Sequence, residues 1–391
     1  MSRQFTIALV ILLAALNPLA NNIYLPALSI MRREFAVSPG EIQYTLSAFL
    51  GGAAAGQLFF GPLSDRLGRR PVLFLGLGLF VLVSVAAVFA QDISSLVLYR
   101  LVQGITGAAS TVIARAIIRD CFPLQEARHV ITLFGMAIGI SPMAAPLIGG
   151  YLTTWVSWRA TLAVLAAYGL LLLVLVFLRY HETRPASTAG FRLRAYPQLL
   201  ADRRFLIPAV SLCSFHGALF AWVATAGLLL PAMTGLPASA VGWMLTLTVL
   251  GYIGGSFAAG RIAAHLSGNA MIILGAGCTA AAGIILATGT SPEGSVILVL
   301  GGAMLSAFGA GIGMGQAMVA AIDPFPERAG TASALAGGMQ FATAGFGGLL
   351  AGWVYDGSAL PLGMVIAAFG SISLLAALYG RHEHLREIRG S

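Results

Sequence analysis

Charged and titratable side chains are the first candidates for chemistry in this chain, and they are few. The 391 residues include 14 acidic side chains, 22 basic side chains and 6 histidines. They form no nucleophile motif, phosphate-binding loop or nucleotide-binding pattern. Cys121, Cys213 and Cys278 lie far apart and give neither a metal-ligand spacing nor a disulfide framework. We therefore expect no enzyme activity, no cofactor and no metal site.

Arg100 is an unusual charge because it lies within the apolar segment 95–118. A charge inside lipid costs several kcal/mol unless it is compensated, so such a residue is a candidate for function. It opens the segment RLVQGITG at 100–107, in which Gln103 lies one helical turn further on. The alternative is an arginine near the outer membrane surface whose side chain extends outward.

A second group of charges surrounds the segment GPLSDRLGRRP at 61–71, which we expect to form a loop between two apolar segments. An acid at the membrane edge is costly unless it is paired. We predict that Asp65, Arg66 and Arg69 form one network with Arg115 and Asp120. Such a network would be a conformational latch, formed in one state and broken in another. The alternative is a basic turn that only fixes membrane topology.

A protein that moved protons through lipid would need a titratable group within an apolar segment, and the acids supply none near the middle of one. His216 is the best candidate in the second half, since histidine has an ordinary pKa of about 6.5. Alternatives are a histidine that only packs, or a weak-acid substrate that carries its own proton. Arg100 without a mid-membrane carboxylate favours neutral or anionic substrates over permanent cations.

The composition shows which elements must position these residues. The chain is 58% hydrophobic and 9% charged, with a mean hydropathy of +0.89, whereas soluble domains carry about 25% charged residues. Lipid must therefore be the solvent. The net charge of +8 does not indicate nucleic-acid binding, because the basic residues are all arginine and mostly fill short gaps between apolar runs.

Helices that cross a bilayer need roughly 20 mostly apolar residues. The chain contains twelve such runs, at 5–28, 42–61, 72–90, 95–118, 130–153, 158–178, 205–230, 241–263, 271–288, 296–321, 329–354 and 360–379. The first run resembles a signal peptide, but no convincing small-residue cleavage site follows it. We expect an all-α membrane protein with twelve transmembrane helices in two six-helix bundles.

The chain divides near its middle. Residues 1–178 are predicted to form the first bundle, 179–204 a cytoplasmic linker, and 205–391 the second bundle with a short cytoplasmic tail. Gly61 and Gly260 are followed at equal spacing by similar glycine-containing segments, so the halves keep a trace of duplication. Most arginines lie in the tails and alternate loops, which predicts that both termini are cytoplasmic. We expect a monomer in a bacterial inner membrane.

The fifth apolar run contains a proline and glycine pattern. Pro142 and Pro146 would bend the helix, and Gly149 and Gly150 would allow a neighbouring backbone to approach closely. In an exporter this bend would seal the cavity against leakage. The alternative is ordinary packing between helices.

Polar and aromatic side chains within the apolar runs are expected to face a central cavity, because lipid penalises polar groups. Asn17 and Asn21 share one helix face. The predicted substrate-binding residues are Asn17, Asn21, Asn22, Tyr24, Arg100, Gln103, Met136, Phe215, His216, Trp222, Trp243, Tyr252, Met314, Gln316 and Gln340.

These motifs together resemble the drug:proton antiporter branch of the major facilitator superfamily, and within it the Bcr/CflA group. The stretches that carry the resemblance are 23–27, 61–71, 100–107, 114–120, 141–150 and 323–332. The resemblance implies export of lipophilic or amphipathic compounds by alternating access, driven by protons. Many relatives carry an acid where this chain has Asn22, so the coupling residue is left open. Alternatives are a dedicated exporter of one metabolite, such as a sugar, siderophore or amino-acid derivative, and a non-transporting membrane sensor.

Overall fold

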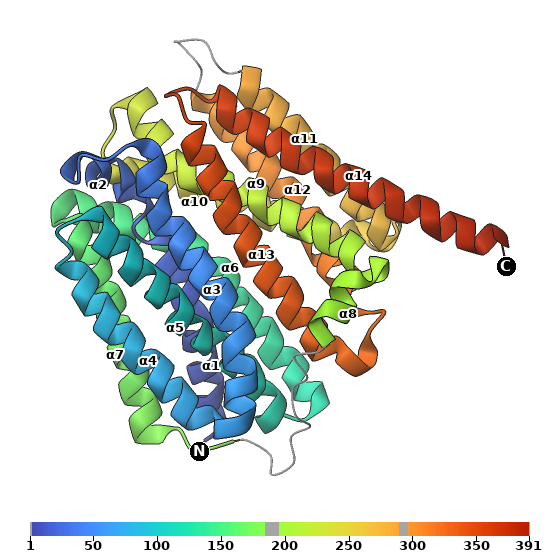
Figure 1. The fold of residues 1–391 in the computed structure, drawn as a ribbon, viewed down its shortest axis with the longest axis horizontal. Coiled ribbons are helices and arrows are strands. Elements are labelled where there is room, and N and C mark those ends of the chain that lie inside the picture. Colours follow the sequence, from blue (N-terminus) through green and yellow to red (C-terminus); the bar gives the residue numbers. More distant parts are fainter. Residues whose placement is uncertain (1, 184–194, 289–295, 391) are drawn as a thin grey trace. The chain divides into compact units, whose positions relative to one another are not determined.

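The structure is a computed structural model that describes residues 2–183, 195–288 and 296–390 (Figure 1). Part of the predicted linker, 184–194, lies outside these residues. Every regular element in the described part of the chain is a helix, and twelve helices are long and apolar enough to cross a membrane. This confirms the predicted all-α membrane fold.

The helices of the first half follow one another with short connections. They are α1 (Arg3–Asn22), the 3₁₀ turn η1 (Leu25–Ala27), α2 (Leu28–Glu34), α3 (Pro39–Leu67), α4 (Arg69–Val88), α5 (Ile93–Cys121), α6 (Leu124–Trp155) and α7 (Trp158–Arg179). Within this half α3 packs along α5, α4 packs against α5 and α7, and α1 packs against α5 and α6.

The second half begins with a short helix. Its elements are α8 (Ala195–Ala201), α9 (Arg203–Thr234), α10 (Ala238–Ile262), α11 (Gly268–Thr288), α12 (Val296–Ile322), the 3₁₀ turn η2 (Pro326–Arg328), α13 (Ala329–Trp353) and α14 (Leu360–Gly390). Here α11 packs against α12 and α14, and α9 packs against α12, α13 and α14.

Contacts divide the chain into two compact units. Unit 1 comprises residues 1–192 and 237–246, and unit 2 comprises residues 193–236 and 247–391. The first turns of α10 therefore cluster with the helices of the first half. In unit 2 the buried core joins α8, α9, α11, α12, α13 and α14 through residues such as Phe205, Phe215 and Leu335.

Glycines allow the closest helix pairs to form. Gly52 and Gly56 of α3 lie against the backbone of α5, and Gly104 of α5 lies against the backbone of α3 at Phe49. A side chain at any of these positions would force the helices apart. The sequence therefore encodes this contact by the absence of side chains rather than by an apolar stripe.

The segment 61–71 is helical rather than the predicted loop. α3 continues to Leu67, and Gly68 alone separates it from α4. Gly68 has a φ of 102°, a conformation that suits glycine, so it can reverse the chain in one residue. At its other end α3 starts at a capping box in which Ser38 and Glu41 exchange hydrogen bonds.

The first predicted span is interrupted. α1 ends at Asn22, and η1 and α2 continue the path as far as Glu34. Pro26 has no amide hydrogen and restricts the residue before it, which explains why the regular helix stops just ahead of it. The interruption leaves backbone carbonyls at the end of α1 available to other donors.

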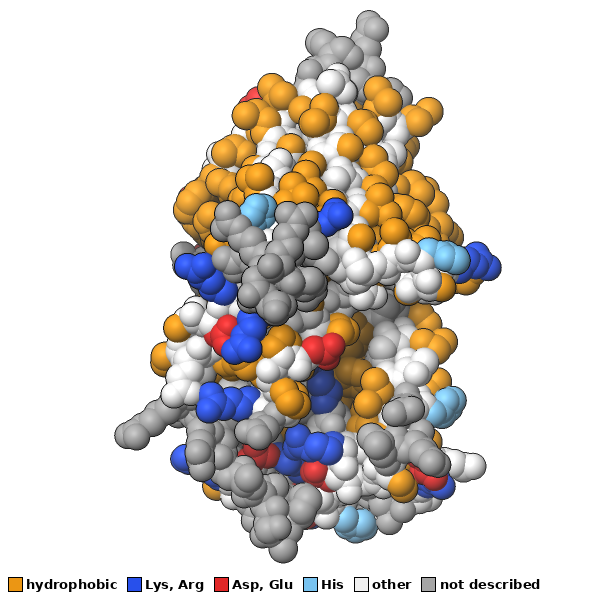
Figure 2. All heavy atoms as spheres, turned by 90° about the vertical axis from the view of Figure 1, so that its right-hand side faces the viewer, with side chains coloured by type: hydrophobic (Ala, Val, Ile, Leu, Met, Phe, Trp, Pro, Cys, Tyr) orange, Lys and Arg blue, Asp and Glu red, His pale blue; other side chains and the backbone are white. Residues whose placement is uncertain are grey.

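Large apolar side chains are exposed over much of the structure, as lipid contact requires. Examples include Phe59, Leu82, Phe177, Ile297 and Leu375, each more than half exposed. Figure 2 shows one face on which an extensive hydrophobic area lies next to a region that carries arginine side chains. This pattern fits helices whose apolar middles face lipid and whose ends carry the charge.

Candidate functional site

Five of the predicted residues are buried on α1, on the turn after it and on α5 of unit 1, and we name them together the unit 1 polar cluster: Asn17, Asn21, Tyr24, Arg100 and Gln103. All five are at most 4% exposed. They come from α1, from the residues that follow it, and from α5, which pack against each other. Asn22, by contrast, donates its side-chain amide to the carbonyl of Pro18 at 2.7 Å and so serves its own helix.

Arg100 is compensated without a carboxylate. Its Nη1 donates to Oε1 of Gln103 at 2.9 Å, and its Nη2 donates to the carbonyl of Ala20 at 3.0 Å. Its guanidinium carbon lies 4.3 Å from the ring centres of both Tyr24 and Phe49. The Ala20 carbonyl belongs to the last turn of α1, the negative end of the helix dipole. Arg100 thus connects α5 to the point where α1 stops.

Gln103 extends this arrangement to a third helix. Its Nε2 donates to Oγ of Ser84 in α4 at 2.8 Å, and Ser84 in turn donates to the carbonyl of Phe80 at 2.6 Å. The amide of Gln103 therefore uses both its oxygen and its nitrogen inside unit 1. Arg100 and Gln103 hold helices in place in this state, and Arg100 keeps one unused donor, its buried Nε.

Asn17 and Asn21 have unused hydrogen-bonding capacity, as do the hydroxyl of Tyr24 and Nε of Arg100. Three buried atoms have no partner among the described residues: Oδ1 and Nδ2 of Asn17, and Oδ1 of Asn21. A buried polar atom without a partner is costly in free energy. Such atoms are candidates for contact with a ligand or water.

Unit 2 contains a second group, the unit 2 polar cluster of His216, Met314 and Gln340. Nε2 of Gln340 in α13 lies 2.6 Å from Nδ1 and 3.0 Å from Nε2 of His216 in α9. The same nitrogen lies 3.6 Å from Sδ of Met314 in α12. The rings of Phe220 and Phe341 lie 5.8 Å and 6.4 Å from that of His216. The cluster offers one titratable ring among aromatic and thioether surfaces.

Other predicted residues have structural partners. Phe215 is fully buried against Gly313, and the indole of Trp222 donates to Oγ1 of Thr248 at 3.2 Å. Tyr252 packs against the core of unit 2. The structure does not bring these three residues into contact with His216 or Gln340 through any hydrogen bond that it describes.

Three further predicted residues lie elsewhere. Gln316 lines a separate cavity at one end of unit 2. Trp243 is 51% exposed and donates its indole N–H to the hydroxyl of Tyr151 at 3.1 Å, within unit 1. Met136 of α6 is 53% exposed.

The predicted latch is built around Arg69, which is 1% exposed. Its guanidinium forms ion pairs with Asp65 at 2.5 Å and with Asp120 at 3.0 Å, and it donates to Oγ of Ser64 at 2.8 Å. The side chain of Asp120 is only 3% exposed, whereas that of Asp65 is 25% exposed. Three helices, α3, α4 and α5, therefore meet at one buried cation.

The other two predicted members of the latch are not among the partners that the structure describes for Arg69. Arg66 is exposed. Arg115 faces the ring of Phe134 at 5.9 Å and makes no ion pair with any described residue. The spacing of charges along the sequence could not distinguish Arg69 from its arginine neighbours, because only the turn at Gly68 directs Arg69 inward.

Glu182 belongs to the same region and was missed from sequence. Its two carboxylate oxygens accept the backbone N–H groups of Arg69 at 2.9 Å and Arg70 at 3.1 Å. An acid at a helix N-terminus is favourable because the N–H groups there lack partners inside the helix. Tyr180 lies close by in the chain; its hydroxyl is 2.8 Å from Oγ1 of Thr183, and burial raises its pKa.

Gly149 and Gly150 of the fifth span are close-contact positions. Gly149 lies against the backbone of Ile23, where α1 is interrupted, and Gly150 lies against the backbone of Ala238 at the start of α10. The prolines Pro142 and Pro146 both lie within the continuous helix α6. Gly242 of α10 in turn lies against the carbonyl of Pro146. Helix α6 therefore approaches two other backbones within unit 1.

A clasp at the opposite end of unit 1 was also missed. Glu34, the last residue of α2, accepts hydrogen bonds from Nε1 of Trp158 and Nη1 of Arg159, both at 2.6 Å. Arg159 also donates to the carbonyl of Ala90 at 3.2 Å. The clasp connects α2, which continues α1, to the start of α7. It could not be predicted from the sequence, because Glu34 lies far along the chain from Trp158 and Arg159.

Comparisons with known proteins agree with this architecture. The family model described as Major Facilitator Superfamily matches residues 10–233. Multidrug resistance protein D of Escherichia coli strain K12 is 31% identical over 392 residues, with 97% of each chain covered. A bicyclomycin resistance protein homolog of Haemophilus influenzae is 28% identical over 381 residues, with 96% of each covered.

Among solved structures, the D-xylose-proton symporter has a TM-score of 0.77 at 16% sequence identity and covers 97% of each chain. At this identity the likeness concerns the fold alone. The family match, the extended sequence similarity and the twelve apolar helices agree with the motifs read from the sequence. The chain therefore belongs to the major facilitator superfamily, and it is a membrane transporter rather than an enzyme.

Proposed function

We propose that this protein is a secondary-active exporter of small lipophilic or amphipathic compounds. The observation that carries the proposal is the similarity, along 97% of both chains, to a protein named multidrug resistance protein D. The relative named for bicyclomycin resistance supports the same class of activity. Alternating access would move the substrate across the membrane, and the proton gradient across that membrane would drive the transport.

The polar clusters suggest how such compounds would be bound. Asn17 and Asn21 offer buried amide atoms without partners, and Tyr24 adds an aromatic ring. His216 and Gln340 lie beside Phe220 and Phe341 in unit 2. A few amide groups among aromatic rings suit ligands that are largely apolar and carry scattered polar atoms.

The charges favour neutral or weakly acidic substrates. Neither polar cluster contains a carboxylate, and the one cation, Arg100, is already compensated by backbone and rings. A permanent cation would therefore find no anionic partner in these clusters, which makes its desolvation costly. We propose that quaternary ammonium compounds are poor substrates.

Protons would be carried either by His216 or by a weak-acid substrate itself. His216 is the titratable side chain of the unit 2 polar cluster, and Gln340 contacts its ring. We further propose that the protein acts as a monomer in the bacterial inner membrane with both termini cytoplasmic, which the arginine distribution supports.

Resistance profiling tests the proposed export. The gene would be expressed in a bacterial strain that lacks its own efflux pumps, and the minimum inhibitory concentrations of neutral, acidic and cationic compounds would be compared. Raised tolerance to several neutral or acidic lipophilic compounds is expected. Raised tolerance to one compound alone would instead indicate a dedicated exporter, and no change with normal expression would favour a sensor.

A further inference from the structure

Arg115 of α5 carries a charge that no described carboxylate balances. It makes no hydrogen bond or ion pair with any residue that the structure describes, and its guanidinium carbon lies 5.9 Å from the ring centre of Phe134 in α6. Asp120, the nearest acid along the chain, is paired instead with Arg69 and Arg119. A cation–π contact weakens near its limit of about 6 Å, so the ring compensates little of the charge.

The position of Arg115 is inside a membrane span and not at its end. Arg115 lies six residues before Cys121, the last residue of α5, which is about 9 Å along a helix axis. In the apolar window of α5, 72% of the residues are buried, the largest share among the twelve spans. Helices α1, α3, α4 and α6 all pack against it. An arginine that only reached out to lipid headgroups would be expected on a less enclosed helix.

Arg115 marks the one opening along the enclosed part of α5. Among residues 102–118, all of which the structure describes, Arg115 alone is exposed. Arg100 on the same helix is only 1% exposed and already donates to Gln103 and Ala20. Of the two arginines within this span, Arg115 is therefore the one whose donors are available to a ligand.

A hydroxyl without a partner lies one helical turn from Arg115. Thr111 is 6% exposed, and its Oγ1 is buried with no hydrogen-bond partner among the described residues. Residues four apart share a helix face, and a long helical side chain covers the turn before its own Cα. Arg115 is therefore expected to extend over Thr111. A polar ligand atom that reached this hydroxyl would relieve the cost of leaving it unsatisfied.

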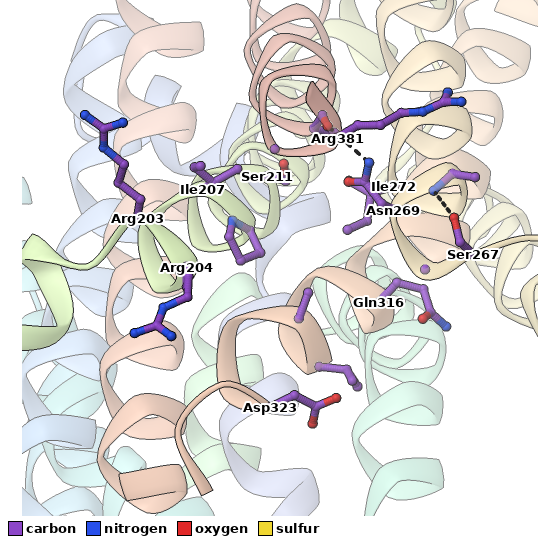
Figure 3. A pocket seen from close by; sticks show the side chains of 17 residues that line it. Arg203, Arg204, Ile207, Ser211, Ser267, Asn269, Ile272, Gln316, Asp323 and Arg381 are labelled. Atoms are coloured by element: carbon purple, nitrogen blue, oxygen red, sulfur yellow. Dashed lines mark hydrogen bonds between the residues drawn. The ribbon is translucent and has the colours of Figure 1, made fainter. Parts of the chain in front are cut away.

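The arginines of unit 2 are arranged differently. A cavity of about 830 Å³ at one end of that unit is lined by Arg203, Arg204 and Arg381, among other residues (Figure 3). Figure 3 shows the guanidinium groups of Arg203 and Arg381 directed away from each other, and Arg204 is paired with Asp202. These arginines do not converge on one ligand. Arg381 nevertheless provides a useful control, because it is exposed and forms no ion pair with a described residue.

We propose that Arg115, Thr111 and Phe134 bind the carboxylate end of a lipophilic weak acid. The carboxylate would lie on the guanidinium group, which binds two oxygens through paired N–H donors. The hydroxyl of Thr111 would donate a further hydrogen bond, and the ring of Phe134 would contact the apolar part of the ligand. The inference rests on the proposed export and names carboxylic acids as a substrate class. It also assigns Arg115 to the substrate and not to the latch.

Equilibrium binding to the purified full-length protein in detergent tests the site. The probes are radiolabelled biphenylcarboxylate, which is ionised at neutral pH, and biphenylcarboxamide, its uncharged amide of similar shape. Arg115→Gln should weaken binding of the acid about ten- to hundredfold, the range for a hydrogen bond to a charged group, and leave binding of the amide nearly unchanged. Thr111→Val should weaken binding of the acid about fivefold. Neither variant should unfold at a lower temperature, because each removes an uncompensated group.

Arg381→Gln is the matched control and should bind both probes as the parent does. Equal affinity for the acid in the parent and Arg115→Gln, equal weakening for acid and amide, or an equal loss in Arg381→Gln would overturn the proposal. Displacement of the acid by phosphatidylglycerol but not by phosphatidylcholine would assign Arg115 to lipid and also overturn it. If Arg115→Gln does not fold, Thr111→Val decides by the same comparison. Export is decided separately by the resistance profile for neutral compounds, so the site can fail while export stands.

Discussion

Two buried arginines in unit 1 are balanced in different ways, and the difference separates their roles. Arg69 meets two carboxylates, whereas Arg100 meets a helix carbonyl, an amide and two aromatic rings. An ion pair can be exchanged for water or for another charge when helices move. Arg100 is instead embedded in the packing of α1, α3 and α5, so we interpret it as a positioning residue for the end of α1.

The carboxylate partners of Arg69 should not be equivalent. Replacing one partner of a buried ion pair costs about 3–5 kcal/mol, because the other charge is left uncompensated. Asp120 is nearly buried and Asp65 is a quarter exposed. Thermal unfolding of purified variants should therefore show a larger loss of stability for Asp120→Asn than for Asp65→Asn.

Asp65→Asn should nonetheless reduce transport while its expression stays close to that of the parent. That combination would mark Asp65 as a conformational residue. Unchanged transport in Asp65→Asn, measured at equal protein level in vesicles, would contradict the latch.

Asn17 allows stability and function to be separated. Both of its side-chain polar atoms are buried without a described partner. If the amide serves a substrate, Asn17→Leu removes an unsatisfied group, so the unfolding temperature should stay equal or rise. Transport of polar-group-bearing substrates should fall about five- to tenfold, the value of one hydrogen bond. A variant that transports normally would show that Asn17 does not bind substrate.

His216 is the residue on which direct proton coupling would depend. His216→Ala should abolish uptake driven by an imposed pH gradient, because the proton carrier is lost, while substrate binding should fall much less, because Asn17 and Asn21 remain. Flux and binding would be measured on the same proteoliposome preparation. Normal gradient-driven flux in this variant would leave the weak-acid substrate as the carrier of the proton.

At the scale of elements, two glycines of α6 differ in the space around them. A side chain at Gly149 would meet the backbone of Ile23, whereas one at Gly139 would meet nothing within 4 Å. Gly149→Ala should therefore cost about 1–3 kcal/mol through overpacking and reduce transport. Gly139→Ala on the same helix should be neutral or stabilising by about 0.5–1 kcal/mol. Equal unfolding temperatures for the two variants would remove the proposed role of the Gly149 contact.

Sequence periodicity predicted the elements better than their ends. Apolar runs of membrane length located all twelve spans because lipid imposes a minimum length on each helix. The run 42–61 became α3 from Pro39 to Leu67, since the capping box at Ser38 and the single-residue turn at Gly68 extend it in both directions. Such ends depend on polar residues outside the apolar run, which hydropathy does not register.

The candidate site was predicted less completely than the spans. Polar residues are unusual within apolar runs, so the sequence alone marked Asn17, Asn21, Arg100 and His216 as site candidates. The partners of these residues could not be predicted, because Glu182 and Ala20 reach Arg69 and Arg100 only through the tertiary packing. The partners of Trp222 and Phe215, which are Thr248 and Gly313, are likewise set by the tertiary packing and not by residue type.

At the scale of the whole molecule, the two halves keep a common plan. Pro39 and Ala238 begin α3 and α10, Arg69 and Gly268 begin α4 and α11, and both pairs have the offset that relates the glycine-containing segments in the sequence. The halves differ in their charges: Asp65 of α3 corresponds to Ala264, just after α10, so unit 2 lacks this carboxylate. We expect the ion-pair latch of unit 1 to have a weaker counterpart in unit 2.

The most direct test of the account is flux through the purified protein in proteoliposomes with an imposed pH gradient. A neutral lipophilic compound, a lipophilic weak acid and a quaternary ammonium dye would be compared, with Gly149→Ala and protein-free liposomes as controls. The account predicts gradient-dependent transport of the neutral or acidic compound, little transport of the dye, and reduced flux in Gly149→Ala. Absence of flux for every compound by a folded protein, or strong transport of the dye alone, would contradict it.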